Sequence, residues 1–207
     1  MNRIIRLAFF SAVLVLAGAS SALAEGTVIT RIEGEASVVR QGQTLPATEG
    51  MTLQKDDTII APAGGGVDVN LNDQAGVRLL AASEGVLDGT GAAMKVRVTS
   101  GNAIMNLKKL PVGTTFELET PTAIAAVRGT QFWGRVDLTS ADNPVTTFAV
   151  REGSVEVLAK STSEKFTLSP GQALDIPKDA ATAPSVREAL TEEMNAMEQA
   201  SSIKTSA

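Results

Sequence analysis

A regular alternation of apolar and polar residues constrains this chain more than any other feature, and it extends from Thr27 to Ile176. In residues 67–72, for example, Val or Leu alternates with Asp or Asn. Successive side chains of a β-strand point to opposite faces, so a period of two predicts strands with one face on a core. Glycines recur at short intervals between these runs, where turns are needed. The segment therefore predicts an all-β domain of many short strands.

A loose internal repeat runs through this segment. A glycine followed by alternating apolar positions occurs at residues 33–38, 100–105 and 152–157. The glycine permits a tight corner, and the apolar positions that follow would face a core. Repeated units of corner and strand favour a β-solenoid or a strongly coiled β-sandwich. Because the copies are unequally spaced, both architectures stay open.

The chain changes character after residue 177. Residues 178–184 form a linker of Ala, Thr and Pro, and Ser185 and Glu188 then have the spacing of a capping box. Apolar residues at helical spacing from Val186 predict an amphipathic helix that continues to about Ala200. This helix is expected to dock on the domain or to fray. The alternative is a partner-binding helix, since methionine-rich faces adapt to varied surfaces.

The first 24 residues have the pattern of a secretory signal peptide. Arg3 and Arg6 precede an apolar run over residues 7–18, and residues 22–24 form a small-x-small cleavage site. We expect cleavage after residue 24 and a periplasmic or secreted protein, with a retained N-terminal anchor as the alternative. No later segment approaches the roughly 18 apolar residues that span a bilayer, so no membrane span is expected after cleavage.

These boundaries predict three parts of the chain. They are a signal peptide (1–24), an all-β domain (25–177), and a linker with a C-terminal helix or tail (178–207).

The composition argues against catalysis. The chain contains no His, no Cys and no Tyr. Without His or Cys, the usual general base, Ser-His and Cys-His nucleophiles and most zinc sites cannot be built. We therefore expect no enzyme activity, no metal and no cofactor.

The net charge of −5 becomes −7 without the two arginines of the signal peptide, and such an acidic chain has no electrostatic footprint for nucleic acid.

Arg128 and Trp133 are the candidate functional residues. Apolar and small residues surround Arg128, and Gly129 follows it, so we expect its guanidinium at a corner near the core. A buried arginine must be paired, which makes it a structural tie to carbonyls and a carboxylate. Alternatively, its planar fork contacts an anion or a partner's carboxylate. Trp133, the only tryptophan, follows Phe132, so one ring should face in and the other out. An exposed Trp133 would be a binding anchor.

The acidic run over residues 68–73 does not fit a calcium loop. An EF-hand needs Gly at position six and Glu at position twelve, where this chain has Asp73 and Leu79. The run instead predicts a strand with its polar face outward, followed by a turn at residues 73–76.

Two further acidic pairs also lack catalytic spacing. Asp56 and Asp57 are neighbours, so on a strand they would point to opposite faces, and we expect a turn there. Glu117 and Glu119 share one strand face and are expected to be solvated charges.

The chain resembles the FecR domain, an all-β module of bacterial envelope signalling proteins, over about Val28 to Ile176. The matching motifs, in chain order, are Gly34-Glu35-Ala36-Ser37-Val38-Val39-Arg40, Glu49-Gly50-Met51-x-Leu53, Asp57-Thr58-Ile59, Gly66-Val67-Asp68-Val69-Asn70-Leu71, Thr120-Pro121-Thr122-Ala123, Val127-Arg128-Gly129-Thr130-x-Phe132, Val150-x-Glu152-Gly153-Ser154-Val155-Glu156-Val157 and Leu168-Ser169-Pro170-Gly171-Gln172. Two positions depart from the pattern, since Asp56 replaces a glycine and residues 73–76 replace an Asp-Gly-Ser turn.

The resemblance implies binding or sensing. We expect a non-catalytic periplasmic protein that binds an envelope protein partner, as a sensory or regulatory subunit of signalling. A module that binds a saccharide or another envelope polymer is the alternative. Anti-sigma regulators of this family carry a cytoplasmic segment and a transmembrane helix before the domain. This chain is expected to carry a cleavable signal peptide there, and so not to signal across the inner membrane alone.

Overall fold

The computed structural model describes residues 26–203 except residues 90, 141, 180 and 182, so the expected signal peptide lies outside the described residues. The described part is mostly β-strands, with one short α-helix and one 3₁₀-helix at its C-terminal end, which confirms the all-β class. The strands are β1 (Thr27–Glu33), β2 (Ser37–Arg40), β3 (Gln43–Pro46), β4 (Thr58–Ile60), β5 (Gly66–Leu71), β6 (Ala75–Leu79), β7 (Glu84–Gly89), β8 (Ala93–Leu107), β9 (Thr115–Glu119), β10 (Ala123–Val127), β11 (Gln131–Asp137), β12 (Val145–Glu152), β13 (Val155–Ala159), β14 (Lys165–Leu168), β15 (Gln172–Pro177) and β16 (Ser185–Glu188). The helices are α1 (Thr191–Ala196) and η1 (Met197–Ser202).

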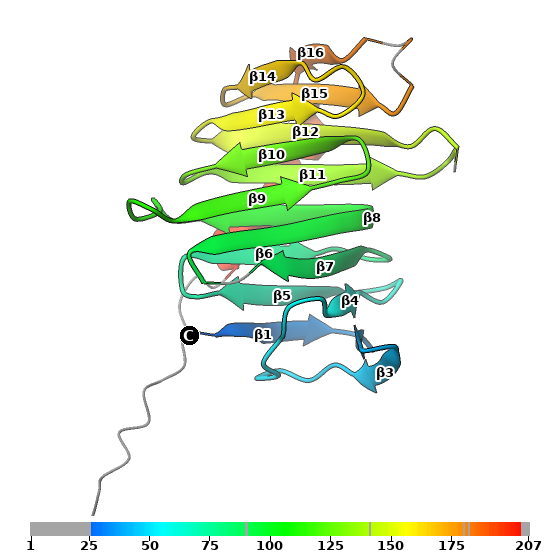
Figure 1. Ribbon diagram of the computed structural model, residues 1–207, viewed down its shortest axis with the longest axis vertical. Helices are drawn as coiled ribbons and strands as arrows, with labels where there is room; N and C mark the ends of the chain where they lie inside the picture. Colours follow the sequence, from blue (N-terminus) through cyan, green and yellow to red (C-terminus); the bar gives the residue numbers. More distant parts are fainter. Residues whose placement is uncertain (1–25, 90, 141, 180, 182, 204–207) are drawn as a thin grey trace, which may run out of the picture.

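The strands form two hydrogen-bonded branches that share the long strand β8. Sheet A has the order β1-β5-β6-β8-β11-β12-β15-β16, and sheet B has the order β3-β2-β4-β7-β8-β9-β10-β13-β14. The first part of β8, through Ser100, pairs in sheet B, and the second part, from Gly101, pairs in sheet A. Figure 1 shows the strands stacked along the long axis of the molecule. The sheet is not closed, so each branch ends in edge strands.

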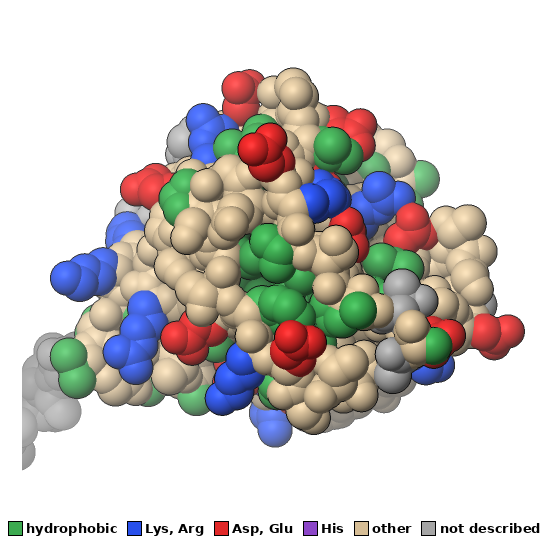
Figure 2. All heavy atoms as spheres, turned by 90° about the horizontal axis from the view of Figure 1, so that it is seen from above, with side chains coloured by type: hydrophobic (Ala, Val, Ile, Leu, Met, Phe, Trp, Pro, Cys, Tyr) green, Lys and Arg blue, Asp and Glu red, His purple; other side chains and the backbone are tan. Residues whose placement is uncertain are grey.

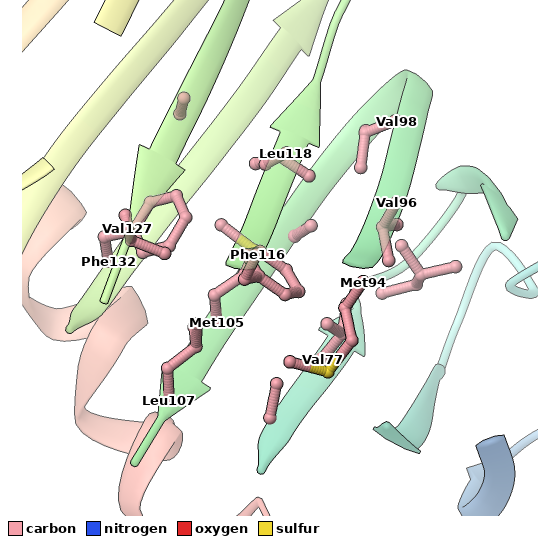
Figure 3. Packing of buried hydrophobic residues seen from close by; sticks show 14 of the residues in the cluster. Val77, Met94, Val96, Val98, Met105, Leu107, Phe116, Leu118, Val127 and Phe132 are labelled. Carbon is pink, nitrogen blue, oxygen red and sulfur yellow. The ribbon is translucent and has the colours of Figure 1, made fainter. Parts of the chain in front are cut away.

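The two sheets meet in one hydrophobic cluster. Their strands alternate buried and less buried residues, because successive side chains point to opposite faces. In β10, for example, the first, third and fifth residues are buried, and the two residues between them are less so. Figure 3 shows Phe116 of sheet B beside Met105 of sheet A, and Met94 of sheet B beside Val77 of sheet A. Burying one such large side chain contributes about 1.5–3 kcal/mol, so this core is the main source of stability in a chain without disulfides.

Charged side chains surround the end of the stack that carries β14 and β16. Figure 2 looks onto this end, where acidic and basic side chains surround a hollow floored by hydrophobic ones. Charges around exposed strand edges oppose pairing with other chains.

The predicted capping box at Ser185 is wrong. Residues 185–188 form strand β16, which pairs with β15, because the free edge of β15 offers backbone partners that a local side-chain cap cannot match. The helix α1 begins later, at Thr191, and it is capped by Glu193, whose Oε2 accepts a hydrogen bond from the Leu190 N–H at 2.7 Å. Both helices pack on the outer face of sheet A, on β8, β11 and β12.

The polar face of β5 does not point into solvent, contrary to the sequence prediction. Asp68 and Asn70 are only 4% and 2% exposed. Asp68 accepts two hydrogen bonds from Arg78, both at 2.6 Å, and Arg78 also donates to Ser202 of the C-terminal segment at 3.3 Å. The turn that follows lies at residues 72–74 and ends earlier than expected, because β6 already begins at Ala75.

Candidate functional site

Arg128 lies at the end of β10, and its side chain is exposed rather than near the core. Strand alternation places Val127 in the core and therefore turns Arg128 outward. The Arg128 side chain makes no hydrogen bond or ion pair with another described residue. Its guanidinium is therefore available to solvent or to a partner.

Other residues of this corner hold it in place. The Thr130 hydroxyl donates to the Ser154 carbonyl at 3.1 Å, and the Arg128 carbonyl accepts from the Leu110 N–H at 3.2 Å. Gly153 has a φ of +83°, and a Cβ there would lie 2.6 Å from the carbonyl oxygen of Gly129. The tie that was expected from Arg128 is thus made by a hydroxyl and by the backbone. Thr130, which follows Gly129 directly and is buried, was the residue in the sequence that could have indicated this tie.

A groove crosses the outer face of sheet B next to Arg128. It consists of two adjoining hollows, of about 440 Å³ and about 460 Å³, which share Glu117, Ala126 and Glu156. The first hollow is also lined by Thr115, Phe116, Val127, Arg128 and Ser154, and the second by Ile124, Val157, Leu158, Lys165, Phe166 and Thr167. We call this the sheet B groove. The two described helices leave it uncovered, since both pack on sheet A.

The register of the strands determines the shape of the groove. Ala126 pairs with Glu117 of β9 on one side and with Glu156 of β13 on the other. A small methyl group therefore forms the floor between two carboxylates. Neither glutamate makes a hydrogen bond or an ion pair with another described residue. The groove thus has two carboxylates at its centre, with Arg128 in one hollow and Lys165 in the other.

Glu119, the neighbour of Glu117 on the same face, is in a different environment. Burial would raise the pKa of its carboxyl, but contacts with Lys160 at 2.7 Å and Lys95 at 2.6 Å lower that pKa to about 2. Glu119 is therefore a paired structural group and not the solvated charge that the sequence predicted.

Trp133 lies on the other sheet. Phe132 points into the shared core, and Trp133 points to the outer face of sheet A, so the predicted alternation of the two rings holds. This face is covered by the C-terminal segment, which leaves Trp133 only 6% exposed. The indole Nε1 has no hydrogen-bond partner among the described residues, and such a buried donor costs about 1–3 kcal/mol. Arg128 and Trp133 do not share a site.

Asp57 makes an ion pair that sequence reasoning missed. It is 1% exposed and accepts hydrogen bonds from Arg40 Nε at 2.8 Å and from the Gln54 N–H at 2.8 Å. Burial would raise its pKa, but these hydrogen bonds bring it below the ordinary value. The expected turn is present at Asp56, whose φ is +70°. Nothing in the local sequence identifies Arg40 as the partner, because it comes from another strand.

Within the described ranges, no group of three or more His, Cys, Asp or Glu side chains is placed to hold a metal ion. Likewise, none of the helices that the structure describes is long and apolar enough to cross a membrane.

The described residues thus form an all-β protein with a groove of mixed polar and apolar lining on the outer face of sheet B. Residues 57–156 match the family model described as FecR protein, so this region of the chain is a FecR domain. The match runs from the residue before β4 into β13 and includes Arg128 and most of the groove. It is narrower than the range expected from the motifs, and it supports a role in regulatory signalling.

Solved structures agree with the fold. Two crystal structures of a "putative anti-sigma factor" from Parabacteroides distasonis ATCC 8503, at 2.50 Å and 1.65 Å resolution, each match with a TM-score of 0.57 and 21% sequence identity. Each match covers 69% of this chain and 64% of the other, so the chain spans less than two thirds of that protein's length. No curated protein matches the chain in sequence.

Proposed function

We propose that this protein is a non-catalytic regulatory protein of the bacterial periplasm that binds another envelope protein as a sensory subunit. Its FecR domain supports the signalling role. Export rests on the signal-peptide pattern of residues 1–24. The anti-sigma description of its structural relatives is in line with a protein partner.

The sheet B groove carries the proposal. Its charged groups Glu117, Glu156 and Arg128 form no ion pair within the described part of the chain. When a partner must present complementary charges, these charges mainly increase the specificity and the rate of association, and they contribute less to the affinity. A partner segment that fits would place a basic group between the two glutamates and a carboxylate near Arg128.

Capture from an envelope extract tests this function. The purified protein, immobilised on a resin, should retain a specific envelope protein, and Arg128→Ala or Glu156→Gln should reduce that retention at least tenfold. Arg151→Ala is the matched control, since Arg151 is an exposed arginine on a strand of sheet A. The proposal fails if groove variants with unchanged far-UV circular dichroism retain the same partner as well as the control does.

A saccharide or envelope polymer is the second candidate ligand. The two adjoining hollows give the groove an elongated shape, which suits a polymer. Against it, sugar sites commonly use exposed aromatic rings. Of the aromatic residues that line the groove, Phe116 is buried and Phe166 is half-buried, and Trp133 lies outside the groove. A pull-down with purified peptidoglycan that depends on Glu117 and Glu156 would favour this candidate over a protein partner.

For the architecture, we infer a coiled β-sandwich in preference to a solenoid. Side chains of sheets A and B meet in one shared core. Among the described residues, every strand pair except β8–β9 is antiparallel, whereas the coils of a parallel β-helix pair in parallel.

A further inference from the structure

A cross-strand row of side chains crosses the outer face of sheet A. The pairing register places one residue from each of six neighbouring strands side by side, in the order Arg78, Ile104, Trp133, Ala149, Ala173, Arg187. The centre of this row is apolar and each end is an arginine. We call it the Trp133 row.

Residues 189–203, here the C-terminal strap, lie over the Trp133 row. Met197 and Ile203 are buried against Ile104 and Trp133 in a cluster separate from the main core. The strap carries the short helices α1 and η1, and a helix of six residues is not stable without such contacts. The strap is therefore held on the sheet by its side chains and by the two ends of the row.

Both arginines of the row bind the strap, and both also have a partner in the sheet. Arg187 donates to Glu193 at 2.6 Å and to Asp175 at 2.7 Å. At the other end, Arg78 donates to Ser202 at 3.3 Å and is paired with Asp68. Since Asp175 and Asp68 belong to sheet A, the arginines stay paired and oriented when the strap leaves. The Trp133 row is therefore already formed by sheet A and does not need the strap to keep its shape.

The strap leaves one hydrogen-bond donor of the surface that it covers without an acceptor. The Trp133 Nε1 donor is buried without a partner among the described residues, in a side chain more than nine-tenths buried. Trp133 also lines a hollow of about 330 Å³ beside the start of α1, together with Thr147, Arg187 and Glu193. An unused donor next to unfilled space indicates that a different occupant would fit this surface better, because it could supply the missing acceptor.

We propose that the Trp133 row is a binding site for an acidic, amphipathic segment of a partner protein, and that the C-terminal strap occupies it in the free protein. The strap itself displays the required chemistry. Glu193 pairs with an arginine, and Met197, four residues later, packs on the apolar centre. A partner segment with this spacing and an acceptor for Trp133 Nε1 displaces the strap. This site is independent of the sheet B groove, which lies on the other sheet.

Trp133 fluorescence in the full chain tests the proposal directly, because Trp133 is the only tryptophan. Met197→Asp should release the strap and shift the Trp133 emission to longer wavelength, while the far-UV circular dichroism of the strands stays unchanged. A synthetic peptide of residues 189–203, which contains no tryptophan, should then reverse that shift in a saturable way. It should bind the Met197→Asp variant at least tenfold more tightly than the unsubstituted chain, where the tethered strap competes.

Matched controls separate the possible outcomes. The same peptide carrying Met197→Asp should not bind, and Arg128→Ala in the protein should leave peptide binding unchanged. Failure of the unsubstituted peptide to bind the Met197→Asp variant overturns the proposal. Loss of the strand signal in both Met197→Asp and the milder Glu193→Gln also overturns it, because the strap would then be an integral part of the fold. Neither result affects partner capture through the sheet B groove.

Discussion

Glu119 illustrates how a single residue of this protein depends on its neighbours. Lys95 comes from β8 and Lys160 follows β13, and both reach the Glu119 carboxylate on the face of sheet B. Their ammonium groups lower the pKa of a carboxyl that burial alone would raise, to about 2. The group therefore stays ionised at all but very acidic pH, and it ties three segments together.

This pKa predicts a pH dependence of stability. A carboxyl whose pKa is lower in the folded than in the unfolded state stabilises the fold above its unfolded pKa of about 4.3. That contribution is lost as the pH falls from there through about 2. In urea denaturation at several pH values, Glu119→Gln should lose less stability than the unsubstituted protein between pH 5 and pH 2. Parallel losses in the two proteins would contradict the assigned ion pairs. Glu117→Gln serves as the control, since Glu117 has no ion pair with the described residues.

Asp56 adopts a backbone conformation that is unfavourable for a residue other than glycine. Its φ of +70° lies in the left-handed region, which glycine adopts most easily. This explains why the FecR resemblance places a glycine at that position. The neighbouring Asp57 uses the resulting corner to reach Arg40 and the Gln54 N–H.

Strand β8 connects the two halves of the fold, because it belongs to both sheets. Its two parts join at Gly101, whose φ is +80°. A Cβ at this position would lie 2.4 Å from Ser83 Oγ and 2.7 Å from Ser83 Cα. Gly101 is therefore required twice, once for the backbone conformation and once for the close approach of Ser83.

Gly101→Ala should accordingly destabilise the protein by about 3 kcal/mol, from left-handed strain of about 1–2 kcal/mol and overpacking of about 1–3 kcal/mol. Gly42→Ala isolates the first effect, since Gly42 has a φ of +79° and a Cβ there would meet no described atom within 4 Å. It should cost only about 1 kcal/mol. Urea denaturation of the two variants measures the difference. Equal losses would mean that the Ser83 contact does not restrict position 101.

The whole molecule should unfold as one unit, because the sheets share β8 and a single core. Phe116→Ala removes a core side chain of sheet B, and Phe132→Ala removes one of sheet A. Each should cost about 3–5 kcal/mol and lower the midpoint of one common transition seen by far-UV circular dichroism. Two separate transitions in either variant would show that the sheets are independent. Leu138→Ala, at an exposed position, is the control.

The sequence by itself determined the all-β class of this protein, the corners of its repeat and its resemblance to the FecR domain. Period-two alternation is a local property, and a positive φ at Gly34, Gly101 and Gly153 follows from the glycine that opens each repeat. The motif Val127-Arg128-Gly129-Thr130 lies within the matched FecR region.

Only the tertiary structure decided what the outward faces meet. The local pattern turns Trp133 and Asp68 away from the core, but the C-terminal strap covers that side, and Arg128 remains uncovered on the other sheet. Likewise, residues 185–188 had a local capping pattern and yet became a strand, because the edge of β15 offered backbone partners. A strand pattern specifies which side chains share a face. Contacts between segments far apart in the chain determine whether that face is buried, paired or open, and no local sequence signal encodes them.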